Sequence, residues 1–129
     1  MFVDGYAGTG AVGIEALSRG AARTIFIERS KNAVRVIQEN LSSLGIENRA
    51  VVVAASAVGN YQADIVFLDP PYEREAEYAP ALSALGENPP SLVVVQHSVR
   101  FVPADSYGLL RKTRTLKQGD NALTFYAPL

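Results

Sequence analysis

Apolar residues in this chain fall either in short unbroken runs or at the spacing of one helix face. Unbroken runs, several rich in β-branched residues, predict five strands, at 1–4, 24–28, 50–54, 63–69 and 91–96. Helical spacing predicts helices over 10–19, from an N-cap at Ser30 to Gly45, and over roughly 75–85. Strands that alternate with helices predict a parallel sheet with helices on both faces.

The last part of the chain has a different pattern. The segments "YGLLRKTRTLK" (107–117) and "NALTFYA" (121–127) predict two antiparallel strands joined by a turn around Gln118-Gly119-Asp120. No internal repeat or linker interrupts the pattern, and 129 residues suit one domain, so we expect residues 1–129 to form a single α/β domain that ends in an antiparallel hairpin.

The amino-acid composition argues against several kinds of functional site. The chain has no cysteine and one histidine, which argues against disulfides and against thiolate or histidine-cluster metal sites, so we expect no metal. It also has no apolar run of membrane-spanning length, so we expect no membrane contact and a cytoplasmic protein. The net charge of −1 does not indicate nucleic acid. A basic cluster is nevertheless present, and it fits a solvated strand face or an RNA-facing patch equally well: Arg100, Arg111, Lys112, Arg114 and Lys117.

A glycine-rich loop follows the first predicted strand. In "DGYAGTGAVG" (4–13), Gly8 and Gly10 allow a sharp turn close to a ligand, and Gly13 allows the next helix to pack on the sheet. Asp4 and Glu28 end the first two strands, and an acid after the second strand suits ribose hydroxyls. Such loops hold phosphates, nicotinamide cofactors or S-adenosylmethionine, or are plain turns. The carboxylate of Asp4 favours S-adenosylmethionine, because the sulfonium and amino groups of that cofactor are cationic.

A second motif, "FLDPPY" (67–72), ends the fourth predicted strand at the same edge of the sheet. Pro70 and Pro71 have no N–H, so their carbonyl oxygens act only as acceptors. Together with the Asp69 carboxylate they can hold both hydrogens of a flat amino group, while Tyr72 offers a face for base stacking. The alternative is an ordinary turn at a strand end.

These motifs together resemble one enzyme family. "DGYAGTGAVGIEALSRGA", "FIERSKNAVRVIQENLSSLGI", "IVFLDPPY" and "GDNALTFY" are similar to the RsmD family, which methylates guanine N2 in small-subunit (16S) ribosomal RNA. The resemblance covers nearly the whole chain. It implies a Rossmann-like class I methyltransferase fold, S-adenosylmethionine as cofactor, and ribosomal RNA or the small-subunit particle as partner, and we expect a monomer.

The resemblance also implies roles for residues. Asp4, Gly8 and Gly10 would line the methionine part of the cofactor, Glu28 would bind its ribose, and Ala55 and Ser56 would flank its adenine. Asp69, the Pro70 carbonyl and Tyr72 would hold the target amine as the catalytic residues, with Pro71 and Tyr72 contacting the base. Transfer would be a direct in-line displacement to a base that has left its stack, with no covalent enzyme intermediate.

Two features depart from the family pattern. Many relatives have an acid at the adenine site, where this chain reads "AASA" (54–57), so Ser56 would be a weaker partner. The family usually has a basic segment before the first strand, whereas this chain begins within that strand. We therefore expect an exposed region of sheet, a poorly closed cofactor site and weak RNA affinity.

Two other functions remain open at this point. The same chemistry could act on adenine or cytosine amino groups in DNA. Alternatively, the chain could be a non-catalytic Rossmann-like domain that binds nucleotide-like ligands. His97 follows a predicted strand with no evident partner, and we interpret it as structural.

Overall fold

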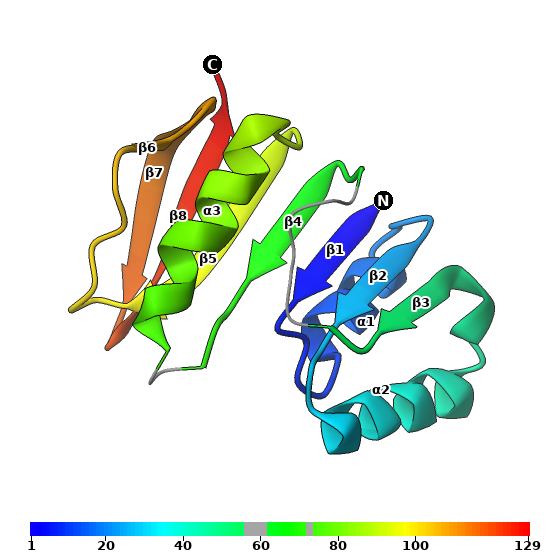
Figure 1. Cartoon of the computed structure of the whole chain (residues 1–129). Helices are drawn as coiled ribbons and strands as arrows, with labels where there is room; N and C mark the ends of the chain where they lie inside the picture. Colours follow the sequence, from blue (N-terminus) through cyan, green and yellow to red (C-terminus); the bar gives the residue numbers. More distant parts are fainter. Residues whose placement is uncertain (56–61, 72–73) are drawn as a thin grey trace.

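A computed structural model describes residues 1–55, 62–71 and 74–129. Within these residues the strands form one sheet in the order β3-β2-β1-β4-β5-β8-β7-β6 (Figure 1). The strands are β1 (Phe2–Gly5), β2 (Thr24–Ile27), β3 (Ala50–Val53), β4 (Ile65–Leu68), β5 (Leu92–Ser98), β6 (Ser106–Tyr107), β7 (Leu110–Gln118) and β8 (Asn121–Pro128).

The first five strands run parallel, and β8 joins β5 in the antiparallel sense. β1 lies between β2 and β4, with Gly5 opposite both Ile27 and Leu68. These strands therefore end level with one another, and whatever follows each of them lies at the same edge. The predicted mainly parallel sheet with a closing hairpin is confirmed, and the short strand β6 was not predicted.

The helices begin and end where local capping allows. They are α1 (Ala11–Ser18), α2 (Lys31–Leu44) and α3 (Tyr78–Glu87), with short 3₁₀ turns η1 (Glu47–Arg49) and η2 (Glu75–Glu77). At the start of α2 the Ser30 hydroxyl accepts from the Ala33 amide at 3.3 Å, and Gly45 ends the helix with φ of 68°. Both predicted ends are confirmed. The third helix begins later than predicted, because residues 75–77 form a 3₁₀ turn first.

Each face of the sheet has its own apolar core. Leu82 and Leu85 of α3 pack with Val66, Leu68 and other buried residues of β4 and β5. On the other face, residues of α1, α2 and β2 pack together, namely Leu17, Phe26, Ile37 and Leu41. Figure 1 shows α3 in front of the sheet and α1 behind it, as alternation of side chains along the strands requires.

Gly13 brings α1 into close contact with the sheet. A β-carbon at this position would lie 2.3 Å from Cε1 and 2.8 Å from Cζ of Phe26, whose side chain is fully buried. No side chain larger than hydrogen fits there without displacing the ring. The packing role predicted for this third glycine of the motif is confirmed.

The face of the hairpin opposite α3 carries partly exposed apolar residues. Leu116 of β7 is 45% exposed and pairs with Leu123 of β8, which is only partly buried. A β-bulge between Lys112 and Arg114 sets Arg114 opposite Phe125, with its guanidinium 5.5 Å from the ring centre. In the described part of the chain, no helix has the length and apolar character needed to cross a bilayer.

Candidate active site

Three loops meet at the carboxyl edge of the central strands. Tyr6, Glu28 and Asp69 come directly after β1, β2 and β4, and these three strands end level with one another. Open α/β sheets bind ligands beyond this edge. The predicted meeting of the glycine loop with the Asp-Pro-Pro turn is therefore confirmed.

The glycine loop is held in a tight conformation. Tyr6, Gly8 and Gly10 have φ values of 60°, 58° and 83°, in the left-handed region. Glycine adopts this region freely, whereas Tyr6 is the one non-glycine residue with positive φ in the described part of the chain. The Gly10 amide closes the turn on the Ala7 carbonyl at 2.8 Å. Backbone strain at Tyr6 is a feature of functional loops.

Glu28 joins this loop to the second strand. Its Oε1 accepts from the Gly8 amide and its Oε2 accepts from the Ser30 amide, both at 2.9 Å. Each carboxylate oxygen still has a lone pair for a further donor. Glu28 is therefore fixed in place at the rim with acceptor capacity to spare.

Asp4 lies beneath the loop. Only 2% of it is exposed, and its Oδ2 accepts from the Gly13 amide at 3.0 Å. Burial raises the pKa of Asp4 to about 7; the Gly13 hydrogen bond opposes this shift, and the charges of Asp69 and Glu28 add to it. Asp4 thus supports the loop from inside, and its predicted contact with a cofactor stays a prediction.

A cavity of about 290 Å³ opens beside these groups. Its described lining comes from the end of β2 and from the loops after β1, β2, β3 and β4: Tyr6, Gly8, Ile27, Glu28, Arg29, Ala55, Asp69, Pro71 and Arg74. Of the residues predicted for the cofactor site, Gly8, Glu28 and Ala55 line this cavity. Asp4 and Gly10, which were also predicted, are not among its lining residues. We call this space the first cavity.

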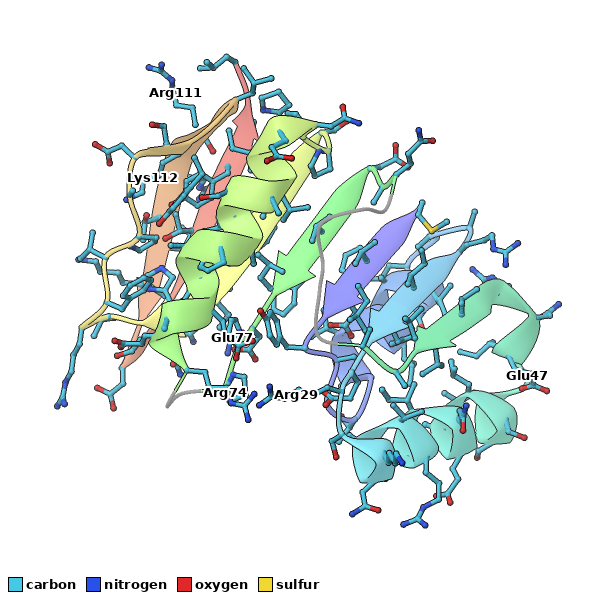
Figure 2. The ribbon with its side chains drawn as sticks, in the orientation of Figure 1. Arg29, Glu47, Arg74, Glu77, Arg111 and Lys112 are labelled. Atoms are coloured by element: carbon cyan, nitrogen blue, oxygen red, sulfur yellow. The ribbon has the colours of Figure 1, made fainter. Side chains whose placement is uncertain are left out.

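Charged side chains gather at the mouth of the first cavity. Figure 2 shows Arg29 and Arg74 pointing toward one another, with Glu77 beside Arg74. The Arg74 guanidinium lies 3.6 Å from the Glu77 carboxylate. Burial, together with this carboxylate, raises the pKa of Tyr6 to about 12, which keeps its phenol neutral.

A second cavity of about 250 Å³ lies on the other side of the Asp-Pro-Pro turn. Asp69 and Pro71 line both cavities, so this turn forms the wall between them. Partial burial in this position raises the pKa of Asp69. The remaining lining comes from the turn itself, η2, the start of α3, the end of β5 and the segment after it, and the start of β8: Pro70, Glu75, Tyr78, Gln96, His97, Ser98, Phe101 and Asn121.

His97 is held by hydrogen bonds on both ring nitrogens. Nε2 lies 2.6 Å from the Thr124 hydroxyl, and Nδ1 lies 2.8 Å from the Ser98 carbonyl, to which it must donate. The residue is 5% exposed. This arrangement agrees with its interpretation as a structural residue.

Some predicted or candidate residues are not brought together. Ser56 and Tyr72 lie outside the described residues, so their predicted roles stay predictions. The basic cluster is divided: Lys112 Nζ donates to the Pro103 carbonyl at 2.8 Å, whereas Arg114 covers Phe125 on the opposite face of the hairpin. Sequence reasoning did not single out Phe101, because it lies in an irregular segment with no motif.

Comparisons with known proteins agree with this geometry. A family model described as "Conserved hypothetical protein 95" matches residues 1–127. Ribosomal RNA small subunit methyltransferase D of Haemophilus influenzae is 34% identical over 128 residues, which span 88% of this chain and 65% of that protein.

Solved structures show the same fold. One described as a conserved hypothetical protein of Streptococcus pyogenes has a TM-score of 0.86 at 27% identity, over 99% of this chain and 85% of that chain. Magnesium protoporphyrin IX methyltransferase of Synechocystis PCC 6803, solved with bound S-adenosylmethionine, has a TM-score of 0.74 at 16% identity, over 100% and 70%. The predicted Rossmann-like class I methyltransferase fold is confirmed.

Proposed function

The chain belongs to the RsmD family of methyltransferases, and from that premise we propose that it transfers a methyl group from S-adenosylmethionine to the N2 amine of a guanine in 16S ribosomal RNA. The observation that carries the proposal is the pair of cavities that share Asp69 and Pro71. A methyl donor in one cavity and a base in the other would meet at this turn.

The first cavity fits S-adenosylmethionine. Glu28 retains acceptor capacity for two ribose hydroxyls and Gly8 offers a close approach of backbone, while Asp4 supports the loop from beneath through the Gly13 amide. When bound, the cofactor supplies an electrophilic methyl group on a cationic sulfur. Support for this cofactor comes from the family and from the fold shared with a methyltransferase solved with it.

The Asp-Pro-Pro turn fits a flat amine. The carboxylate of Asp69 and the carbonyl of Pro70 are acceptors, and neither proline can donate. Holding both N–H groups in this way would direct the nitrogen lone pair toward the first cavity. The amine must lose a proton once the new bond forms, and Asp69, whose pKa is raised by burial, is placed to accept it.

Ribosomal RNA is the proposed substrate because a relative is named as a small-subunit rRNA methyltransferase. The turn lies at the sheet edge between the two cavities, so a base within a helix could not reach it. We therefore propose that the target guanine is flipped out of its stack or already lies in a loop.

Label transfer tests the proposal. The chain would be incubated with methyl-labelled S-adenosylmethionine and with undermethylated 16S RNA, small-subunit particles or duplex DNA. Digestion to nucleosides and mass spectrometry should find N2-methylguanosine from the ribosomal substrates alone. Methylated adenine or cytosine in DNA would overturn the choice of substrate, and binding of S-adenosylhomocysteine without transfer to any substrate would favour a binding domain.

Asp69 and Asp64 form a matched pair of variants, because they flank the two ends of β4. Asp69→Ala should lower transfer by more than about 100-fold, the scale seen when a group that stabilises a transition state is removed, with little change in S-adenosylhomocysteine affinity. Asp64→Ala, at the far end of the strand, should transfer methyl groups like the unmodified chain. Full activity of Asp69→Ala would refute the role given to this residue.

A further inference from the structure

The second cavity contains an aromatic cluster that the proposed function does not yet use. Phe101 lies 4.8 Å from Tyr78, centre to centre, with the rings 24° from parallel. The His97 ring meets Phe101 edge-on at 6.0 Å. Phe101 is only partly buried and lines the cavity, whereas Tyr78 and His97 are 4% and 5% exposed.

The neighbours of Phe101 hold it firmly. The Tyr78 hydroxyl donates to the Gln96 carbonyl at 2.8 Å, and burial, with the charge of Asp69 adding to it, raises the pKa of Tyr78 to about 12. His97 is fixed between the Ser98 carbonyl and Thr124. One face of the Phe101 ring is therefore packed on a rigid support, so binding a second ring on its remaining surface would cost little side-chain entropy.

We propose that the second cavity is the chamber for the target base and that Phe101 is the surface on which the base stacks. This inference rests on the proposed function and adds a substrate-binding residue to it. At about 250 Å³ the cavity has room for a single nucleobase. Asp69 lines this cavity and the first cavity, so a base bound here would lie next to the proposed cofactor site.

Amide-bearing residues complete the chamber. Asn121, the first residue of β8, pairs with Ser98 of β5. Gln96 lies two residues before Ser98 on β5, and all three residues line the cavity. Main-chain and side-chain groups of these residues include both donors and acceptors, which is what a base edge requires. A base stacked on Phe101 would thus place one edge at Asp69 and the other near these polar groups.

Substitution of Phe101 tests the inference. Phe101→Leu keeps an apolar side chain over Tyr78 but removes the aromatic face. We expect the KM for RNA to rise about 5- to 150-fold, the range that base–aromatic stacking supports. The dissociation constant for S-adenosylhomocysteine should stay within twofold of the unmodified chain, whereas a general loss of structure would weaken both. Phe101→Tyr, which restores a ring, should restore the KM.

A second readout does not depend on catalysis. 2-Aminopurine riboside has its amine at the ring position of guanine N2, and its fluorescence is quenched on aromatic stacking. With S-adenosylhomocysteine present, the unmodified chain and Phe101→Tyr should quench it, and Phe101→Leu should not. Phe125→Leu is the matched control, because Phe125 is a half-buried aromatic on the opposite face of the sheet.

The outcomes separate the two proposals. If the unmodified chain transfers no methyl group, the proposed function fails, while Phe101-dependent quenching would still support the base chamber. If Phe101→Leu keeps both its KM and its quenching within twofold of the unmodified chain, Phe101 is a packing residue only and the inference is overturned.

Discussion

The backbone amide of Gly13 donates a 3.0 Å hydrogen bond to the Asp4 carboxylate at a site almost closed to solvent. This bond ties the first turn of α1 to β1 and so fixes the shape of the glycine loop between them. The hydrogen bond lowers the pKa of Asp4 by less than burial raises it, so the pKa is about 7. The loop is therefore built on a carboxylate whose ionised form is unfavourable in the folded chain.

Asp4 should make the stability of the chain depend on pH. Its pKa is about 7 when folded and 3.8 as the reference value, so the folded chain keeps a proton that the unfolded chain releases. The resulting stability is complete below about pH 4 and is lost as the pH rises toward 7. The free energy of unfolding of Asp4→Asn, relative to that of the unmodified chain, should therefore rise by up to about 4 kcal/mol between pH 4 and pH 8. Urea unfolding at both values measures this.

Ser30→Ala is the control for that experiment, because it removes the hydroxyl that caps α2 and no ionisable group. Its stability relative to the unmodified chain should not change between pH 4 and pH 8. A gap for Asp4→Asn that is equal at the two pH values would show that Asp4 does not carry the titration.

Glu28→Gln should weaken both the loop and the cofactor site. The amide has one acceptor oxygen, so the N–H of either Gly8 or Ser30 loses its partner. We expect a loss of about 1 kcal/mol in the free energy of unfolding and about 10- to 100-fold in S-adenosylhomocysteine affinity. Calorimetry measures the affinity, with Glu39→Gln on the exposed side of α2 as control. Unchanged affinity would remove Glu28 from the proposed ribose site.

Local pattern was sufficient to predict most of the fold. Short apolar runs and helical spacing predicted the parallel strands, and capping residues predicted both ends of α2 at Ser30 and Gly45. The Asp-Pro-Pro turn and the glycine loop were expected at one edge because parallel strands end together. β6 was missed because residues 107–117 were predicted to form one strand, whereas a two-residue turn at Gly108 and Leu109 folds Ser106–Tyr107 back onto the start of β7.

Side-chain orientation at the site could not be predicted in the same way. β1 has four residues and is buried on both faces, so no polar alternation shows that Asp4 points beneath the loop. Phe101 lies in an irregular segment, and its place against Tyr78 depends on how α3 packs over β5. Both positions follow from long-range packing, which one sequence does not display.

Gly13→Ala should destabilise the chain, although alanine normally favours helix. Glycine to alanine in an exposed helix gains about 1 kcal/mol. Here the added carbon would lie 2.3 Å from the Phe26 ring, so we expect a loss of about 1–3 kcal/mol from overpacking instead. Phe26→Leu in the same chain should recover part of this loss, and chemical unfolding of both single variants and the double variant measures the coupling. Additive losses would show that the two residues do not conflict.

Arg49 should stabilise the end of α1 through its geometry rather than its charge alone. Its Nη2 donates to the carbonyls of Leu17 and Ala21 at 3.1 and 2.6 Å, and Nε lies 3.5 Å from that of Ala22. Arg49→Gln should cost about 1–3 kcal/mol, because helix-end carbonyls lose a charged donor. Arg49→Lys should lose less stability than Arg49→Gln but remain less stable than the unmodified chain, since one ammonium cannot reproduce the planar array of donors of a guanidinium. Because Arg49 precedes β3, at the edge opposite the cavities, S-adenosylhomocysteine affinity should not change. Full recovery by lysine would show that charge alone is sufficient.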